Sequence, residues 1–211
     1  MEESNKYQAA KIILAMDETS KSYILTNGTN DYYNKLRIAH KDILDKKECE
    51  YLLFAYTILC VSTLEYSLNY MLSSHCLDKF GPDWYKKHTE AYISINFNKK
   101  LLMSPSIVSD GKYLMNEDNH AYKNLLELIA LRNKIVHNKE FLKELTFTDI
   151  EVVSTEKEFE IEFTEVLKEL TNKQCLEFGE SLGKFKNFIM IPALNNTFGE
   201  NEMVIKNPTI S

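Results

Sequence analysis

Glycine and proline are scarce in this sequence. Its 211 residues include only 6 Gly and 4 Pro. A turn-rich β architecture needs more of both. The shortage therefore favours long helices over a β architecture, and 44% hydrophobic with 27% charged residues fits one globular domain.

Cysteine is also sparse, and its four positions are far apart. Cys49, Cys60, Cys76 and Cys175 contain no C-x-x-C pair, so we expect no zinc site of ordinary ligand spacing. We expect no other metal and no cofactor. The four residues are interpreted as reduced, mostly buried thiols of a cytoplasmic protein, because no signal peptide is recognisable at the N-terminus.

Positive charge is in short supply. The chain has 25 Lys and Arg against 31 Asp and Glu, a net charge of -6. This excludes a protein that coats nucleic acid through bulk charge, but not one with a local basic cleft. Long apolar runs are missing as well: the uncharged residues 51–64 number only 14, which predicts a core helix and no membrane span.

Hydrophobic periodicity predicts an all-α bundle. Gly81-Pro82 should end the most apolar helix, and Pro192 the last one. An irregular connection containing Ser104-Pro105-Ser106 and Asp110-Gly111 should precede the helix that Asp118 or Asn119 caps. The predicted helices cover residues 5–24, about 30–44, 47–80, about 85–93, about 119–145 and about 164–191.

One segment alternates as strands do. Residues 149–153 and 158–163 place apolar side chains on one face and glutamates on the other, which predicts a small β-hairpin inserted near residues 149–163. Residues 1–192 should form a single helical domain. Residues 193–211 are polar and should form a loosely held C-terminal tail.

The residues best suited to chemistry lie on the helix predicted at 119–145, in the sequence Arg132-Asn133-Lys134-Ile135-Val136-His137. A guanidinium matches phosphate oxygens and stabilises charge that develops on phosphorus. An imidazole titrates near neutrality and can move protons to or from a ribose hydroxyl. Arg132 and His137 together therefore suit phosphodiester cleavage without a metal, with Asn133 orienting either group.

Helical geometry does not bring Arg132 and His137 together directly. Five residues apart, they lie about 140° around the helix axis, whereas Asn133 and His137 share a face. Either the long stem of Arg132 swings round, or a second copy of the helix packs across the first. A structural interpretation also stands: a surface ion pair for Arg132, and a histidine favoured by the dipole at a helix end.

The segment Leu128-Ile129-Ala130-Leu131-Arg132-Asn133-Lys134-Ile135-Val136-His137-Asn138 resembles the signature of the HEPN superfamily. This resemblance implies a small all-α bundle that is usually dimeric. Many members are metal-independent endoribonucleases of toxin–antitoxin, abortive-infection and CRISPR systems. Their Arg and His line a cleft between two subunits, and the ribose 2′-hydroxyl attacks. Matched residue by residue, the catalytic set is Arg132, Asn133 and His137.

Other positions follow less directly. Lys134, Asn138 and Lys139 are candidates for contacts with the RNA, and Glu65, on the preceding long helix, is a candidate partner of Arg132. HEPN toxins paired with a nucleotidyltransferase antitoxin often carry Tyr two residues after the His, where this chain has Lys139, so that mode of inactivation is not implied. The histidines outside the motif share no ligand spacing and are interpreted as ordinary surface or capping residues: His40, His75, His88 and His120.

The sequence thus predicts a cytoplasmic, homodimeric HEPN-type ribonuclease of prokaryotic antiviral defence or toxin–antitoxin biology. Its expected partners are RNA and an antitoxin or other defence-system protein. The alternative is a non-catalytic HEPN-like module that binds a partner protein, a nucleotide or RNA, which the net negative charge fits somewhat better.

Overall fold

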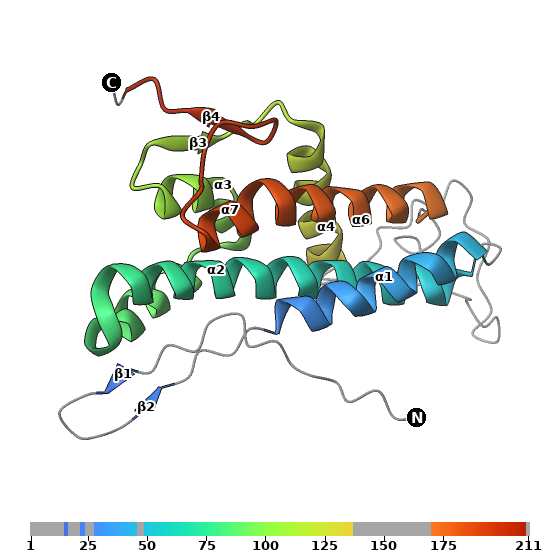
Figure 1. Cartoon of the computed structure of the whole chain (residues 1–211). Coiled ribbons are helices and arrows are strands. Elements are labelled where there is room, and N and C mark those ends of the chain that lie inside the picture. Colours follow the sequence, from blue (N-terminus) through green and yellow to red (C-terminus); the bar gives the residue numbers. More distant parts are fainter. Residues whose placement is uncertain (1–14, 17–21, 24–27, 46–48, 137–169, 210–211) are drawn as a thin grey trace, which may run out of the picture.

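The computed structural model describes residues 15–16, 22–23, 28–45, 49–136 and 170–209, and this part of the chain is mainly helical (Figure 1). The all-α prediction is confirmed at this level. Helix α1 lies along α2, α6 contacts both of these helices, and α4 crosses between α2 and α6 (Figure 1). The bounds of these helices are α1 Thr29–Asp45, α2 Glu50–Ile93, α4 His120–Val136 and α6 Asn172–Phe185.

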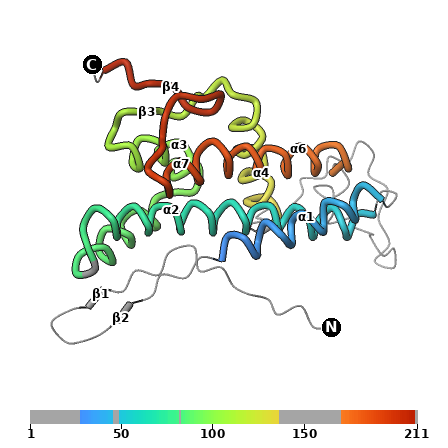
Figure 2. Tube along the Cα trace, viewed as in Figure 1, coloured from blue at the N-terminus to red at the C-terminus, as the bar shows by residue number. Residues whose placement is uncertain are grey.

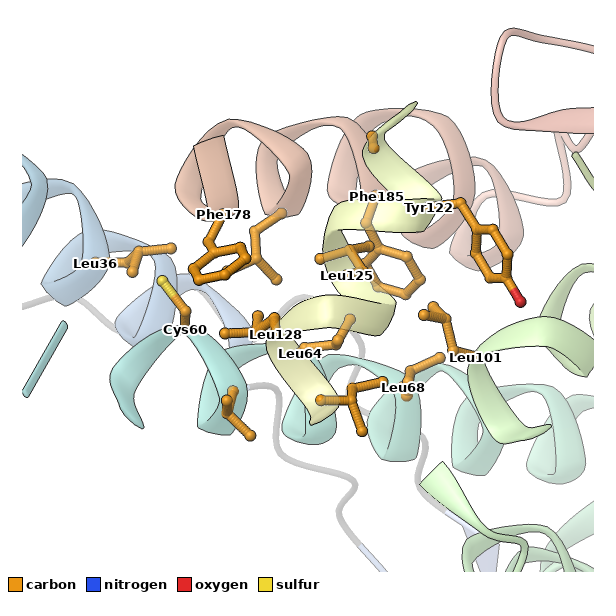
Figure 3. Close-up of a cluster of buried hydrophobic side chains, with 14 of the residues drawn as sticks. Leu36, Cys60, Leu64, Leu68, Leu101, Tyr122, Leu125, Leu128, Phe178 and Phe185 are labelled. Carbon is orange, nitrogen blue, oxygen red and sulfur yellow. The ribbon is translucent and has the colours of Figure 1, made fainter. Parts of the chain in front are cut away.

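The core forms where these helices meet. Figure 3 shows Phe178 and Phe185 of α6 directed toward Leu125 and Leu128 of α4, with Leu64 of α2 beneath them. All five side chains are at most 1% exposed. Burying a side chain of this size contributes about 1.5–3 kcal/mol, so this contact provides a large share of the stability of the domain.

The central helix α2 behaves largely as predicted. Its backbone leaves the helical region at Gly81 (φ 73°, ψ 177°), and the helix then resumes as far as Ile93. Pro82 disfavours a helical conformation at the residue before it, and Gly81 accepts the positive φ without strain. Glu50–Gly81 is long and apolar enough to cross a membrane by length and composition, but half of that apolar window is buried, as in the core helix of a globular domain.

The predicted irregular connection before α4 is wrong. Residues Phe97–Val108 form helix α3, with Pro105 inside it. Proline cannot bond to the carbonyl four residues earlier, that of Leu101. Here the Ser104 hydroxyl donates to that carbonyl oxygen instead (2.9 Å), so the helix continues past the proline.

Helix α3 ends at the turn that the sequence indicates. Asp110 (φ 54°) and Gly111 (φ 84°) take left-handed conformations. The Gly111 N–H donates to the Ser106 carbonyl (2.7 Å) and the Asp110 N–H to that of Ile107 (3.4 Å). This is the Schellman pattern of hydrogen bonds at a helix C-terminus. Asp110 also forms an ion pair with Lys79 of α2.

The last predicted helix, about 164–191, is interrupted at residues 170–171 and ends later than predicted, while residues 164–169 lie outside the described residues. Thr171 caps α6 by accepting from the Gln174 N–H (3.2 Å), so residues 170–171 are not helical. After α6 the chain passes through a π-helical turn, η1 (Lys186–Met190), into α7 (Ile191–Leu194), so Pro192 does not end the helix.

The C-terminal segment is not a loosely held tail. Strand β4 (Val204–Lys206) pairs antiparallel with β3 (Tyr113–Met115), and Figure 2 shows the chain returning beside that strand. Met203 is fully buried and Val204 is 1% exposed. These residues complete the core, so residues 193–206 belong to the domain.

The predicted helix over residues 5–24 is wrong where the structure describes it. Strands β1 (Ala15–Met16) and β2 (Ser22–Tyr23) pair antiparallel there. The hydroxyl-bearing residues Thr19, Ser20 and Ser22 weaken helix propensity between the apolar positions. The hairpin predicted near residues 149–163 lies outside the described residues.

Candidate functional site

The motif helix α4 begins as predicted. Asn119 caps it, its side-chain oxygen accepting from the Tyr122 N–H (3.1 Å). Leu125 and Leu128 are fully buried on the face that packs into the core. Arg132, seven and four residues further on, continues the same row and is half-buried at the C-terminal end of the described helix. The core packing of α4 therefore fixes where Arg132 leaves the bundle.

Arg132 is oriented by its neighbour in the motif. Its Nη1 donates to the side-chain oxygen of Asn133 at 3.1 Å. The guanidinium carries five N–H donors in one plane, so a single such bond restricts how that plane is turned. Asn133 and the following Lys134 are exposed. This end of α4 presents a planar cation, an amide and an ammonium close to solvent.

The other motif residues, His137, Asn138 and Lys139, lie outside the described residues. The predicted approach of His137 to Arg132 and the composite site between two subunits therefore stay predictions. Within the described chain, α4 ends at Val136.

Glu65 lies beside a different cation. Lys100 of α3 is only 3% exposed, and its Nζ donates to Asn69 Oδ1 at 2.9 Å. Burial lowers the pKa of Lys100, and the charge of Glu65 opposes that lowering. Glu65 and Asn69 are four residues apart on one face of α2, so together they stabilise a buried ammonium. The pairing of Glu65 with Arg132 stays a prediction.

Three of the four thiols do not suit nucleophilic catalysis. Cys60, Cys76 and Cys175 are buried, and all four cysteines are free. Burial raises the pKa of Cys60, Cys76 and Cys175, which keeps these three protonated near neutrality. In the part of the chain that the structure describes, no cluster of three or more His, Cys, Asp or Glu side chains could hold a metal ion.

A second candidate site is a pocket of about 260 Å³ between α1 and α6. Helix α1 contributes Tyr33, Leu36, Arg37 and His40. The other lining residues are Tyr56 of α2 and Gly179, Glu180 and Gly183 of α6. Sequence reasoning gave His40 no role, because its partner Tyr56 is 16 positions away on another helix. The two glycines four residues apart on α6 are the signal that sequence offered for a gap there.

No family model matches this chain, and neither a curated protein nor a solved structure matches it.

Proposed function

We propose that the chain is a metal-independent endoribonuclease of the HEPN type. The observation that carries the proposal is the hydrogen bond from Arg132 to Asn133 at the accessible end of α4. A guanidinium turned by a neighbouring amide suits one task well, which is bidentate contact with the oxygens of a phosphodiester. A mainly helical domain, the architecture that the sequence resemblance implies, supports the same proposal.

The reaction assigns one role to each motif residue. The ribose 2′-oxygen attacks the adjacent phosphorus, the bond to the 5′-oxygen breaks, and a 2′,3′-cyclic phosphate forms. His137 removes the proton of the 2′-hydroxyl or orients that group, and the leaving 5′-oxygen gains a proton. Arg132 stabilises the charge on the phosphate oxygens, and Asn133 positions the guanidinium. Lys134, Asn138 and Lys139 would contact the RNA backbone near the site.

Two copies of the chain would complete the site. Arg132 and His137 do not align on one helix, so the proposal places α4 of one subunit across α4 of its partner. The negative net charge of -6 means that RNA must be attracted locally, by the cations of two motifs brought together. We propose a cytoplasmic role in prokaryotic defence or toxin–antitoxin biology, with a partner protein that restrains cleavage.

The test is RNA cleavage by the purified chain in the presence of EDTA. We expect fragments that end in a 2′,3′-cyclic phosphate, and loss of about 10²–10⁴-fold in rate for His137→Ala, the usual contribution of a proton-transferring group. His120→Ala is the matched control, because His120 is exposed at the opposite end of the same helix. It should cleave at the wild-type rate.

A second substitution tests the role of the guanidinium. Arg132→Lys keeps the positive charge but loses the planar fork, so cleavage should fall while the fold is retained. Arg37→Lys, at the other arginine of the chain, should leave cleavage unchanged. Equal cleavage by His137→Ala and wild type would refute the proposal. Binding of RNA without cleavage would favour the non-catalytic module instead.

A further inference from the structure

The pocket between α1 and α6 exists because α6 has no side chain at two positions. A Cβ atom built on Gly179 would overlap the Tyr56 hydroxyl and come within 3.0 Å of His40 Nδ1, so the α6 backbone lies directly against that pair. A Cβ atom on Gly183, one turn later, would have no neighbour within 4 Å. Gly179 therefore fixes the approach of the helices, and Gly183 leaves the space.

The walls of the pocket are mainly apolar. Tyr56 is 1% exposed, and its hydroxyl lies 2.8 Å from His40 Nδ1. The Tyr33 hydroxyl donates to the Leu182 carbonyl (3.3 Å). Burial raises the pKa of both tyrosines, so both hydroxyls stay neutral. Since both hydroxyls already have partners, the pocket offers a ligand chiefly carbon surface.

Two opposite charges lie on facing helices around this apolar space. Arg37 on α1 and Glu180 on α6 both line the pocket and are exposed. They form no ion pair with each other in the described part of the chain. The charges of Arg37 and Glu180 are equal and opposite. A polyanion would gain from Arg37 and lose to Glu180, whereas a zwitterion can satisfy both.

We propose that this pocket binds a small zwitterion with an apolar side chain, the chemical class of a free apolar amino acid. The carboxylate lies on Arg37, the ammonium on Glu180, and the side chain between the tyrosines over Gly183. A cavity of about 260 Å³ suits a ligand of this size. No residue of α4 lines the pocket, so the proposal does not depend on the ribonuclease activity.

The test is calorimetric titration of the full chain with L-leucine and L-phenylalanine. Leucinamide lacks the carboxylate, N-acetyl-leucine lacks the ammonium, and AMP serves as the anionic competitor. At least one of the two amino acids should bind, with the three comparison compounds about tenfold weaker or worse, since each loses one charge-assisted contact. Failure of both amino acids to bind at about 1 mM, or equal binding of AMP, overturns the proposal.

Variants then assign the contacts. Arg37→Gln should weaken the amino acid about tenfold and abolish its advantage over leucinamide. Lys41→Gln, one turn further on the same helix, exposed and outside the lining, is the matched control and should bind as wild type does. Gly183→Leu should fill the pocket and abolish binding while far-UV circular dichroism shows a folded chain. Undiminished binding by Arg37→Gln or by folded Gly183→Leu would show that the ligand lies elsewhere.

Discussion

Replacing Gly179 by alanine should destabilise the protein, although alanine is the better helix former. The added methyl group would overlap the hydroxyl of Tyr56, which is only 1% exposed, and a shift of that ring would break its bond with His40. Gly183 on the same helix provides the matched substitution. Alanine there would meet no atom within 4 Å.

The expected magnitudes follow from three contributions. Alanine in place of glycine inside a helix stabilises by about 1 kcal/mol. Overpacking a buried site costs about 1–3 kcal/mol, and loss of the bond between His40 and Tyr56 costs about 1 kcal/mol more. Gly179→Ala should therefore lower the free energy of unfolding by about 1–3 kcal/mol. Gly183→Ala should raise it by about 0.5–1 kcal/mol.

Urea unfolding followed by far-UV circular dichroism measures both variants. A double variant separates the overlap from other effects, because Tyr56→Phe removes the hydroxyl that the new methyl group would strike. Gly179→Ala should cost less in the Tyr56→Phe background than in wild type, giving a coupling energy of about 1–2 kcal/mol. If Gly179→Ala is at least as stable as Gly183→Ala, the close approach of α6 to the His40–Tyr56 pair is refuted.

Two further predictions concern the ends of α3 and β4. Met203→Ala should lower the free energy of unfolding by about 2–5 kcal/mol, the range for a buried methionine. Ile205→Ala, two residues further on and 44% exposed, should change it little. Thermal or urea unfolding that ranks the two variants equally would contradict the buried C-terminal segment. The Lys79 ammonium bonds to Asp110 and lowers the pKa of that carboxyl in the folded state, so its stabilisation is complete above the unfolded pKa of about 3.9 and is lost as the pH falls through the folded pKa. Asp110→Asn removes the carboxylate but keeps a residue type that tolerates the positive φ. Between pH 7 and pH 3, the urea midpoint of this variant should fall less than that of wild type. The difference should be small, because the Lys79 and Asp110 side chains are both exposed.

Helices with one apolar face were predictable because periodicity records burial directly. The motif helix carries Leu125, Leu128 and Ile129 at core spacing, and all three are fully buried. The break in α2 was also predictable from the sequence, because Gly81 permits a positive φ and Pro82 restricts the conformation of the residue before it. Local chemistry determines both features.

Proline misled the prediction at two places, and for one physical reason. A proline in a helix leaves the carbonyl four residues earlier without its usual donor. For Pro105 that carbonyl belongs to Leu101, which accepts from the Ser104 hydroxyl. For Pro192 it belongs to Phe188, which accepts from the Asn201 side-chain amide at 2.9 Å. The second donor comes from 13 residues away along the chain, so sequence neighbourhood could not reveal it.

The C-terminal strand was missed because its partner is distant in sequence. Val204 pairs with Met115, and the Asn116 and Asn119 side chains both donate to the Glu202 carbonyl at 3.0 Å. Only two buried apolar residues, Met203 and Val204, mark this segment, too few for a periodic signal. Tertiary contacts alone place it in the core.

The motif could be predicted from the sequence, whereas the pocket could not, again because its residues are distant in sequence. The motif is contiguous, so its chemistry could be inferred from one peptide, and the bond between Arg132 and Asn133 agrees with the positioning role expected of Asn133. The pocket joins residues from three helices, and only Gly179 and Gly183 indicate it locally. Glycines four apart can as easily mark tight helix packing as a cavity, and the coordinates of their neighbours decide between the two.

Helix α6 packs against the motif helix on one face and lines the pocket on another, and the two sites remain separate. Its Phe178 and Phe185 side chains pack on α4, the helix that carries Arg132, as Figure 3 shows, while its two glycines face α1. The chain has only two arginines, and each belongs to one site. Substituting Arg132 therefore probes RNA cleavage with the pocket intact, and substituting Arg37 probes the pocket with the motif intact. Because each substitution leaves the other cation in place, a substitution that leaves its own activity unchanged counts against one proposal without bearing on the other.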